Sequence, residues 1–270
     1  MGPGPSDAGT NQPALADFVA LNDPAERRRV ERDGAYFVVE GLLAIERLLS
    51  LPEWHIRSIA LLPRAADRLA DALSSAGVDP TVVDEQVLRH VVGFDLHRGA
   101  LASVDRRPPR PLDELVAASS LLVVAEGIND HENLGAIYRN AAAFAAGAVL
   151  LDPTCADPFY RRSVRVSLGH VLAVPTGATG PLPAGLDRLH ELGVTTMALA
   201  PGAETALRDV NRVELGDGPL AVIIGAEGPG LSPGVLAAAT HRVAIPMAPG
   251  VDSINVAAAT AVALHHLTRP

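Results

Sequence analysis

The chain has 270 residues, of which 48% are hydrophobic and 20% charged, so it can bury a sizeable core in one or two domains. No apolar run approaches the roughly 18–20 uncharged residues of a membrane span, and the first ten residues lack the basic and apolar regions of a signal peptide. The sequence therefore predicts a cytoplasmic protein that does not enter a membrane. Its formal net charge of −9 argues against general binding of polyanions, although all 22 basic residues are Arg, a type well suited to phosphate.

The sequence contains few residues that could form a disulfide or a metal site. Cys155 is its single cysteine, which excludes an intramolecular disulfide and a cysteine-rich zinc site. The nine histidines show no tight ligand spacing apart from the adjacent His265 and His266. We therefore predict that the protein holds no metal.

The first part of the chain predicts a tail followed by a small α/β domain. Residues 1–33 are rich in Gly, Pro, Asp, Asn and Arg and predict a flexible tail, whose Arg27, Arg28 and Arg29 either contact a nucleic acid or lie on a solvated helix face. Residues 34–107 alternate strand and helix patterns, with strands expected at 36–39, 56–62, 82–83 and 100–104 and helices at 42–49, 65–76 and 85–91. Three prolines then break all periodicity and predict a linker at 108–115.

Residues 116–270 predict a second α/β domain that keeps its own core. Continuous apolar runs indicate strands at 121–125, 148–151, 171–174, 194–199, 220–224 and 243–245. Helical patterns separate most of these runs. This alternation is typical of a largely parallel sheet that helices cover on both faces.

A first polar motif follows the strand expected at 121–125, and it reads Glu126-Gly-Ile-Asn-Asp-His-Glu-Asn133-Leu-Gly135-Ala-Ile-Tyr-Arg139-Asn140. In a regular helix Asn133, Ile137 and Asn140 would share one face, whereas Arg139 would lie one turn beyond Gly135 on another. Taken alone, Asn133 is an ordinary N-cap and Arg139 a surface residue.

A second motif follows the strand expected at 220–224, and it reads Ile223-Ile-Gly225-Ala-Glu227-Gly-Pro229-Gly230-Leu-Ser232. Three glycines at the carboxyl end of an apolar strand predict a loop whose main-chain groups contact a ligand. The order G-x-x-G-x-G and the missing amide of Pro229 argue against a dinucleotide site. Glu227 is either catalytic or holds the loop by hydrogen bonds.

The third motif reads Ile245-Pro-Met247-Ala-Pro-Gly-Val-Asp-Ser253-Ile254-Asn255-Val, and an alanine-rich helix is expected after it at 257–267. By themselves, Ser253 and Asn255 are polar residues that cap this helix.

Together the three motifs, in this order and spacing, resemble the SpoU (TrmH) branch of the SPOUT RNA methyltransferases over residues 116–270. Residues 160–169 resemble the helix that this family places between its second and third strands. Residues 34–107 are similar to the L30e-like RNA-binding module that is often fused to these enzymes, notably at 37–41 and 93–101. The resemblance implies an α/β trefoil-knot domain with a largely parallel sheet, preceded by a small L30e-like α/β domain.

The resemblance also implies the cofactor and the site. S-adenosylmethionine would be held bent in the knot, with family cofactor positions falling on Gly225, Gly230, Ile245, Met247 and Ile254. The family's functional polar positions fall on Asn133, Arg139, Glu227, Ser253 and Asn255. Ala226 stands where some members have asparagine, and Ile254 stands where leucine is commoner, a change of similar volume.

The implied activity is methyl transfer from S-adenosylmethionine to a ribose 2′-hydroxyl of structured RNA. The family's Arg is assigned to hydroxyl activation, but a guanidinium stays protonated in proteins. We therefore expect Arg139 to bind the substrate phosphate and stabilise negative charge on the ribose oxygen. Glu227 would orient its loop, and Ser253 and Asn255 would fix the knot and the adenosine pocket.

The two-domain arrangement favours 23S ribosomal RNA as substrate, because it resembles that of ribosomal RNA enzymes. A homodimer is expected because the family's knot pairs across an apolar interface. The alternatives are a tRNA 2′-O-methyltransferase, a non-catalytic knotted RNA-binding protein, and an enzyme of the same scaffold acting on a base or a small molecule.

Overall fold

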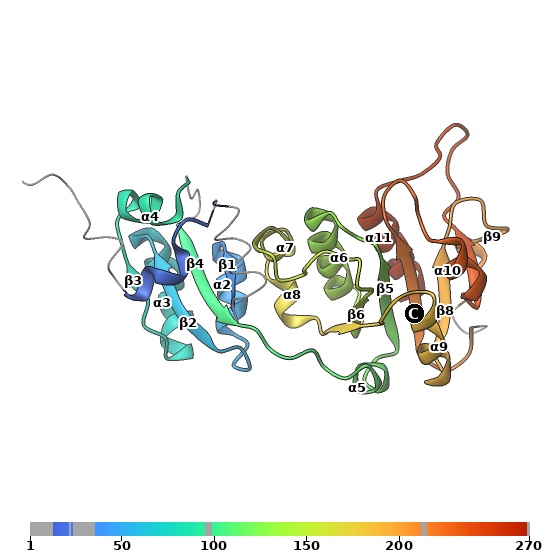
Figure 1. The fold of residues 1–270 in the computed structure, drawn as a ribbon, viewed down its shortest axis with the longest axis horizontal. Helices are drawn as coiled ribbons and strands as arrows, with labels where there is room; N and C mark the ends of the chain where they lie inside the picture. Colours follow the sequence, from blue (N-terminus) through green and yellow to red (C-terminus); the bar gives the residue numbers. More distant parts are fainter. Residues whose placement is uncertain (1–12, 22, 24–35, 95–98, 212–214, 269–270) are drawn as a thin grey trace, which may run out of the picture. The chain divides into compact units, whose positions relative to one another are not determined.

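The computed structural model describes residues 13–21, 23, 36–94, 99–211 and 215–268, so the arginines at 27–29 lie outside the described residues. The chain divides into two compact units. Unit 1 comprises Met1–Arg107 and Phe159–Leu172, and unit 2 comprises Pro108–Pro158 and Ala173–Pro270. Figure 1 shows both units in sequence colours, and each is described by itself.

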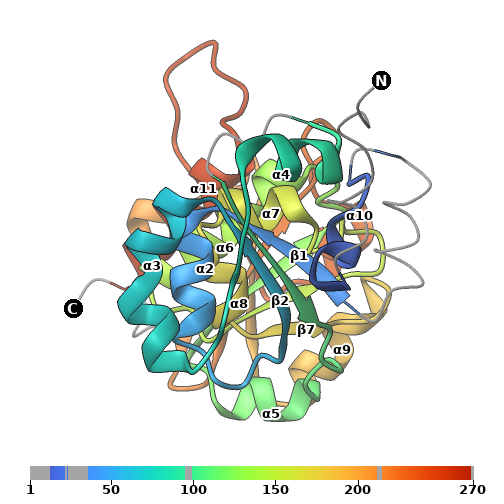
Figure 2. The same cartoon turned by 90° about the vertical axis from the view of Figure 1, so that its left-hand side faces the viewer.

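Unit 1 is built on a four-stranded sheet in the order β1-β4-β2-β3. β4 pairs antiparallel with β1 and β2, and β3 is parallel to β2. The strands are β1 (Tyr36–Glu40), β2 (Ile56–Leu61), β3 (Thr81–Val82) and β4 (Ala100–Asp105), and the helices are α2 (Leu42–Leu49), α3 (Pro63–Ala76) and α4 (Glu85–Val92). Figure 2 shows α2 and α3 side by side. The strands and helices predicted for residues 36–105 are confirmed, with ends that move by one or two residues.

The segment before β1 corrects part of the predicted tail. Residues Pro13–Phe18 form the 3₁₀ helix η1, in which Leu15 and Phe18 are completely buried. They pack in one apolar cluster with Tyr36 and Val38 of β1. The prediction of a flexible tail is therefore wrong for these residues, because a polar composition around two large apolar side chains concealed their packing.

Helix α7 (Arg161–Val166) lies against β1, the strand at one edge of this sheet. Phe159, just before α7, packs with Phe37 and Trp54, at centroid distances of 4.9 and 5.6 Å. The Trp54 indole Nε1 donates to the Leu172 carbonyl oxygen at 2.9 Å, and the Arg47 guanidinium donates to that of Leu168. Residues 159–172 thus pack against the β1 edge of this sheet.

The strand predicted at 171–174 is wrong. Residues His170–Ala173 form helix α8, and two residues separate it from the next strand, β7 (Thr176–Ala178). A four-residue apolar run has no periodicity that distinguishes strand from helix. β7 escaped prediction because it is short and contains Gly177, where a Cβ would lie 2.5 Å from Leu115 and 2.7 Å from Leu150.

Unit 2 contains a seven-stranded sheet, in which every recorded pairing is parallel, in the order β7-β6-β5-β10-β8-β11-β9. Its other strands are β5 (Leu121–Glu126), β6 (Ala148–Leu151), β8 (Thr195–Leu199), β9 (Thr205–Ala206), β10 (Leu220–Gly225) and β11 (His241–Ala244). The predicted parallel sheet is confirmed, and the strand expected at 243–245 begins two residues earlier. The trefoil knot stays a prediction.

Helices cover both faces of this sheet, as expected. α5 (Leu112–Ala117), α9 (Ala184–Glu191) and α10 (Pro233–Ala238) share one apolar cluster with the strands, whereas α6 (His131–Ala143) packs with α11 (Val256–Leu267). The chain moves outward in one direction from β5 to β6 and β7, and β10 lies on the other side of β5. Open α/β sheets bind ligands at the carboxyl ends of strands where the order reverses in this way.

Candidate active site

A cleft of about 340 Å³ lies at the carboxyl end of β10. Its walls are the end of β8, the loop after β10, and both ends of the long segment between β11 and α11, which Figure 1 shows in orange and red. Apolar side chains dominate the lining, and a few polar ones join them. The polar lining residues are Glu227, Ser253 and Asn255.

The loop after β10 folds back onto the strand it leaves. Gly230 donates its N–H to the Ala226 carbonyl at 3.0 Å, which closes the loop. A Cβ at Gly225 would lie 2.4 Å from the Gly230 carbonyl carbon and the Leu231 nitrogen, so only glycine permits this approach. The predicted glycine loop is present, and its main chain lines the cleft.

Asn255 is the centre of the polar cluster. Its Oδ1 accepts from the N–H groups of Ala257 and Ala258 at 2.9 and 3.2 Å and so caps α11. Its Nδ2 donates to Asn133 Oδ1 at 2.7 Å and to Glu227 Oε1 at 2.8 Å. The Asn255 side-chain amide therefore uses its oxygen to cap α11 and its two N–H groups to join the three motifs.

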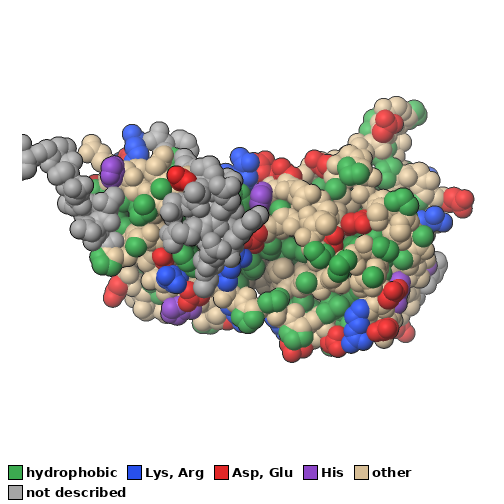
Figure 3. Space-filling model, in the orientation of Figure 1, with side chains coloured by type: hydrophobic (Ala, Val, Ile, Leu, Met, Phe, Trp, Pro, Cys, Tyr) green, Lys and Arg blue, Asp and Glu red, His purple; other side chains and the backbone are tan. Residues whose placement is uncertain are grey.

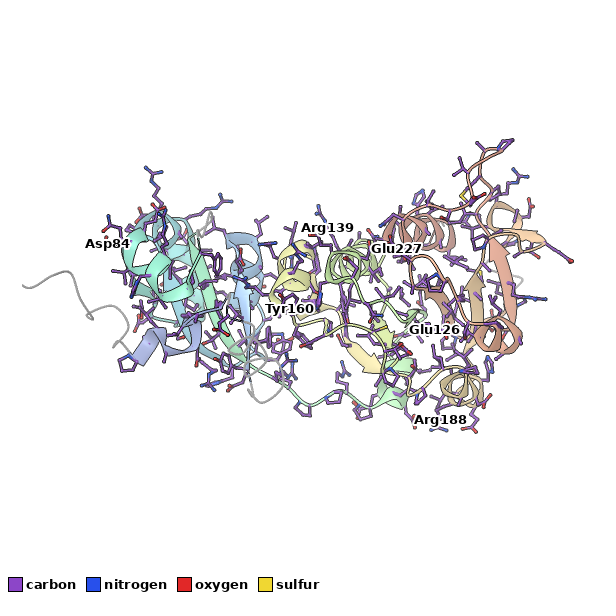
Figure 4. All side chains as sticks on the ribbon, turned by 45° about the horizontal axis from the view of Figure 1, so that its top comes forward. Asp84, Glu126, Arg139, Tyr160, Arg188 and Glu227 are labelled. Carbon is purple, nitrogen blue, oxygen red and sulfur yellow. The ribbon has the colours of Figure 1, made fainter. Side chains whose placement is uncertain are left out.

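Helix α6 presents two faces, as the spacing predicts. Asn133 bonds to Asn255, and Asn140 Nδ2 donates to the Ala257 carbonyl at 2.7 Å, so both face α11. Asp130, not Asn133, is the N-cap, because its Oδ1 accepts from the N–H groups of residues 132 and 133. Figure 4 labels Arg139, which lies on α6 and is exposed. In the described part of the chain it has no hydrogen-bond or ion-pair partner.

The structure brings together eight of the ten residues that the sequence nominates. Those that line the cleft are Gly225, Glu227, Gly230, Ile245, Met247, Ser253, Ile254 and Asn255. Asn133 joins them through its bond to Asn255, whereas Arg139 lines no part of the cleft. Ser253 is exposed, and its side chain makes no hydrogen bond with the described residues. The catalytic and cofactor-binding roles of these residues stay predictions.

Two carboxylates that are not among the predicted site residues stabilise the loops of the first and second motifs. Glu126, which pairs in register with Gly225, accepts from the Ser232 N–H at 2.8 Å and so fixes the far end of the glycine loop. Asp152, at the end of β6, is buried and accepts from the Gly127 N–H at 3.0 Å. Burial raises the pKa of the neighbouring Cys155 thiol to about 12, so the thiol stays protonated and can donate to the Ala125 carbonyl. Polar residues at the carboxyl ends of adjacent parallel strands are the signal that could have identified both carboxylates.

No group of three or more His, Cys, Asp or Glu side chains in the residues that the structure describes is arranged to hold a metal ion. None of the described helices has the length and apolar character needed to cross a bilayer.

Comparison with known proteins decides the family. A family model described as SpoU rRNA methylase matches residues 120–265, which include all three motifs. The chain belongs to the SpoU rRNA methylase family. The resemblance stated from the motifs is thereby confirmed, and the protein is an RNA methyltransferase of this family.

Similar proteins extend over both units of this SpoU methylase. An uncharacterised tRNA/rRNA methyltransferase of Mycobacterium tuberculosis is 38% identical over 259 residues, which cover 96% of this chain and 90% of that protein. The crystal structure of an RNA 2′-O ribose methyltransferase is 26% identical, with a TM-score of 0.73 and 96% of each chain covered. An AdoMet-bound rRNA methyltransferase from Sinorhizobium meliloti shares the fold, at 24% identity, a TM-score of 0.77 and coverage of 96% of this chain and 94% of that one.

The double role of Asn255 in this SpoU methylase leads to a test. Asn255→Ala should lower the free energy of unfolding by about 1–2 kcal/mol, since it removes an N-cap. Asn255→Asp keeps a capping oxygen but loses the donor and places a second carboxylate beside Glu227, so it should retain more stability while weakening ligand binding in the cleft. Chemical denaturation and calorimetry measure the two effects. A loss well below about 0.5 kcal/mol in Asn255→Ala would contradict the capping role.

Proposed function

We propose that the protein transfers a methyl group from S-adenosylmethionine to a ribose 2′-hydroxyl of structured RNA, with 23S ribosomal RNA as the favoured substrate. The observation that carries the proposal is the hydrogen-bonded cluster of Asn133, Glu227 and Asn255, which joins the three motifs and contributes two side chains to the lining of the cleft. The 26% identical structure described as an RNA 2′-O ribose methyltransferase supports the ribose as target.

The cleft fits S-adenosylmethionine, the compound bound in the Sinorhizobium meliloti structure. Its volume of about 340 Å³ is in the range of small-molecule sites, about 300–1,000 Å³. The apolar lining of Leu199, Ile245 and Met247 suits an adenine ring, and the main chain of the glycine loop offers donors and acceptors. When bound, S-adenosylmethionine supplies a methyl group on a positively charged sulfur, which makes that carbon open to attack by an oxygen.

The residues of this chain would position and stabilise the reacting groups. Glu227, held by Asn255, would orient the glycine loop, and Ser253 and Asn255 would shape the adenosine pocket. Arg139 is exposed and so can reach an RNA phosphate, and it would stabilise negative charge that develops on the ribose oxygen. Since its guanidinium stays protonated, the hydroxyl proton would leave to phosphate, water or a second residue.

The substrate proposal is tested in cells that lack the gene. Mass mapping of ribose methylation should show one 2′-O-methyl group missing from 23S ribosomal RNA, and wild-type protein should restore it. Loss of the methyl group from tRNA instead would favour the tRNA alternative. Unchanged RNA together with no binding of S-adenosylmethionine in calorimetry would favour the non-catalytic alternative.

We also propose that the protein is a homodimer. Exposed residues of α11 include Ala258, Val262 and His265, so part of this helix is available for close packing against a second copy. Light scattering at micromolar concentration should give twice the mass of one chain. A monomer would contradict this.

A further inference from the structure

Charge is divided unevenly between the two units. The sequence of unit 1 holds 15 Arg and 16 Asp or Glu residues, a net charge of −1, whereas that of unit 2 holds 7 Arg and 15 Asp or Glu residues, a net charge of −8. Figure 3 shows acidic side chains spread over the drawn face of unit 2. Such a surface repels phosphates, so we expect arginines gathered in unit 1 to supply most of the attraction for an RNA backbone.

Five arginines gather around residues 159–166 of unit 1, and we call them the arginine cluster: Arg106, Arg107, Arg161, Arg162 and Arg165. Two of them stack on the aromatic side chains beside α7. Arg107 lies 5.3 Å from the centroid of Trp54, and Arg106 lies 5.9 Å from that of Phe159. The other three belong to α7 itself. Stacking on an aromatic ring orders the guanidinium groups of both arginines, and Arg107 is also exposed.

A nearly buried carboxylate orients two further members of the cluster. Glu40 is 7% exposed and lies 3.4 Å from Arg161 and 3.2 Å from Arg165. Burial lowers the pKa of Arg161, whereas the charge of Glu40 raises it. The positive charges of Arg165 and Arg162 also lower this pKa, so the three guanidinium groups lie close enough to repel one another. Arg107 and Arg162 are exposed, and the Arg165 side chain is 41% exposed. A bound anion would reduce the repulsion between like charges that are held together in this way.

We propose that the arginine cluster is a phosphate-binding surface through which unit 1 holds the backbone of the RNA substrate. This rests on the proposed RNA methylation, and it names the surface that provides affinity. A guanidinium matches phosphate with two parallel N–H donors, and groups already oriented by Glu40 and the aromatic rings lose less freedom on binding. Helix α7 lies within the stretch matched by the methylase family, yet it would serve RNA binding as part of unit 1.

The test compares two full-length double variants with the same net charge. Arg107→Ala with Arg162→Ala removes two exposed members of the cluster, and Arg208→Ala with Arg242→Ala removes two exposed arginines of unit 2. Binding to a transcript of 23S ribosomal RNA is measured at several salt concentrations. The slope of log affinity against log salt should fall in magnitude by about 1.5 in the cluster variant, because each phosphate contact accounts for about 0.7–0.9. The unit 2 variant should keep the wild-type slope.

Each outcome decides the proposal. An unchanged slope in the cluster variant, equal losses in both variants, or a wild-type protein that does not bind the transcript would overturn it. The single variant Arg162→Ala, at an exposed position, should lower the magnitude of the slope by about 0.8. It keeps the test valid if loss of the Arg107 stacking unfolds the double variant. Calorimetry with S-adenosylmethionine on the same proteins tests the proposed function separately, because the cluster lies in unit 1 and the cleft in unit 2.

Discussion

Arg139→Ala should reduce methyl transfer to RNA by about 10²–10³-fold, the loss found when one donor to a developing oxyanion is removed. The affinity for S-adenosylmethionine should stay within about twofold of the wild type, a small free-energy change. Both expectations follow from position: Arg139 is exposed on α6 and lines no part of the cleft, whereas Glu227 and Asn255 line it. Calorimetry measures the affinity, and transfer of a tritiated methyl group measures the rate.

Two variants sharpen this result. Arg139→Lys keeps the positive charge but loses the planar pair of donors, so it should recover part of the rate if the role is electrostatic. Arg188→Ala removes an exposed arginine of unit 2 that already pairs with Asp113 and Glu191, and it should leave the rate unchanged. Loss of S-adenosylmethionine binding in Arg139→Ala would move Arg139 into the cofactor pocket and refute the assignment.

The secondary structure could be predicted wherever periodicity extended over enough residues. Long amphipathic or apolar segments such as α3 and β10 appear at their expected places. The prediction failed at 171–174, where four apolar residues fit either type, and at β7, where close packing demands a glycine that gives no apolar signal. It also failed at η1, a six-residue segment with two large buried side chains.

The site could be predicted as three motifs, but the bonds between the motifs could not. Asn255 and Asn133 are 122 residues apart, and Ser232 and Glu126 are 106 apart, so no local pattern records either contact. The same limit applies to α7. Its sequence lies between two strands of the methylase sheet, and its contacts in the folded protein, such as the packing of Phe159 on Phe37 and Trp54, assign it to unit 1.

A fragment of residues 108–270, which keeps α5, should retain the sheet of unit 2 but lose the structure of residues 159–172. Val164 is completely buried, and a six-residue helix such as α7 does not persist alone in water. The packing partners that the fragment lacks include Phe37 and Trp54, and loss of one large aromatic contact typically costs about 3–5 kcal/mol. Amide exchange in 159–172 should therefore be at least about 100-fold faster than in the full chain, since about 1.4 kcal/mol corresponds to tenfold.

Exchange measured by peptide provides the control within one sample. The central strands β5 and β10 pair with each other and are buried in unit 2, so their amides should exchange at the same rate in the fragment and in the full chain. Trp54→Ala in the full chain removes the ring beside Phe159 and the bond to the Leu172 carbonyl, and it should reproduce part of the effect without any truncation. Equal protection of 159–172 in the fragment and the full chain would show that this segment is held by unit 2, and the arginine cluster would then lose the scaffold that orients it.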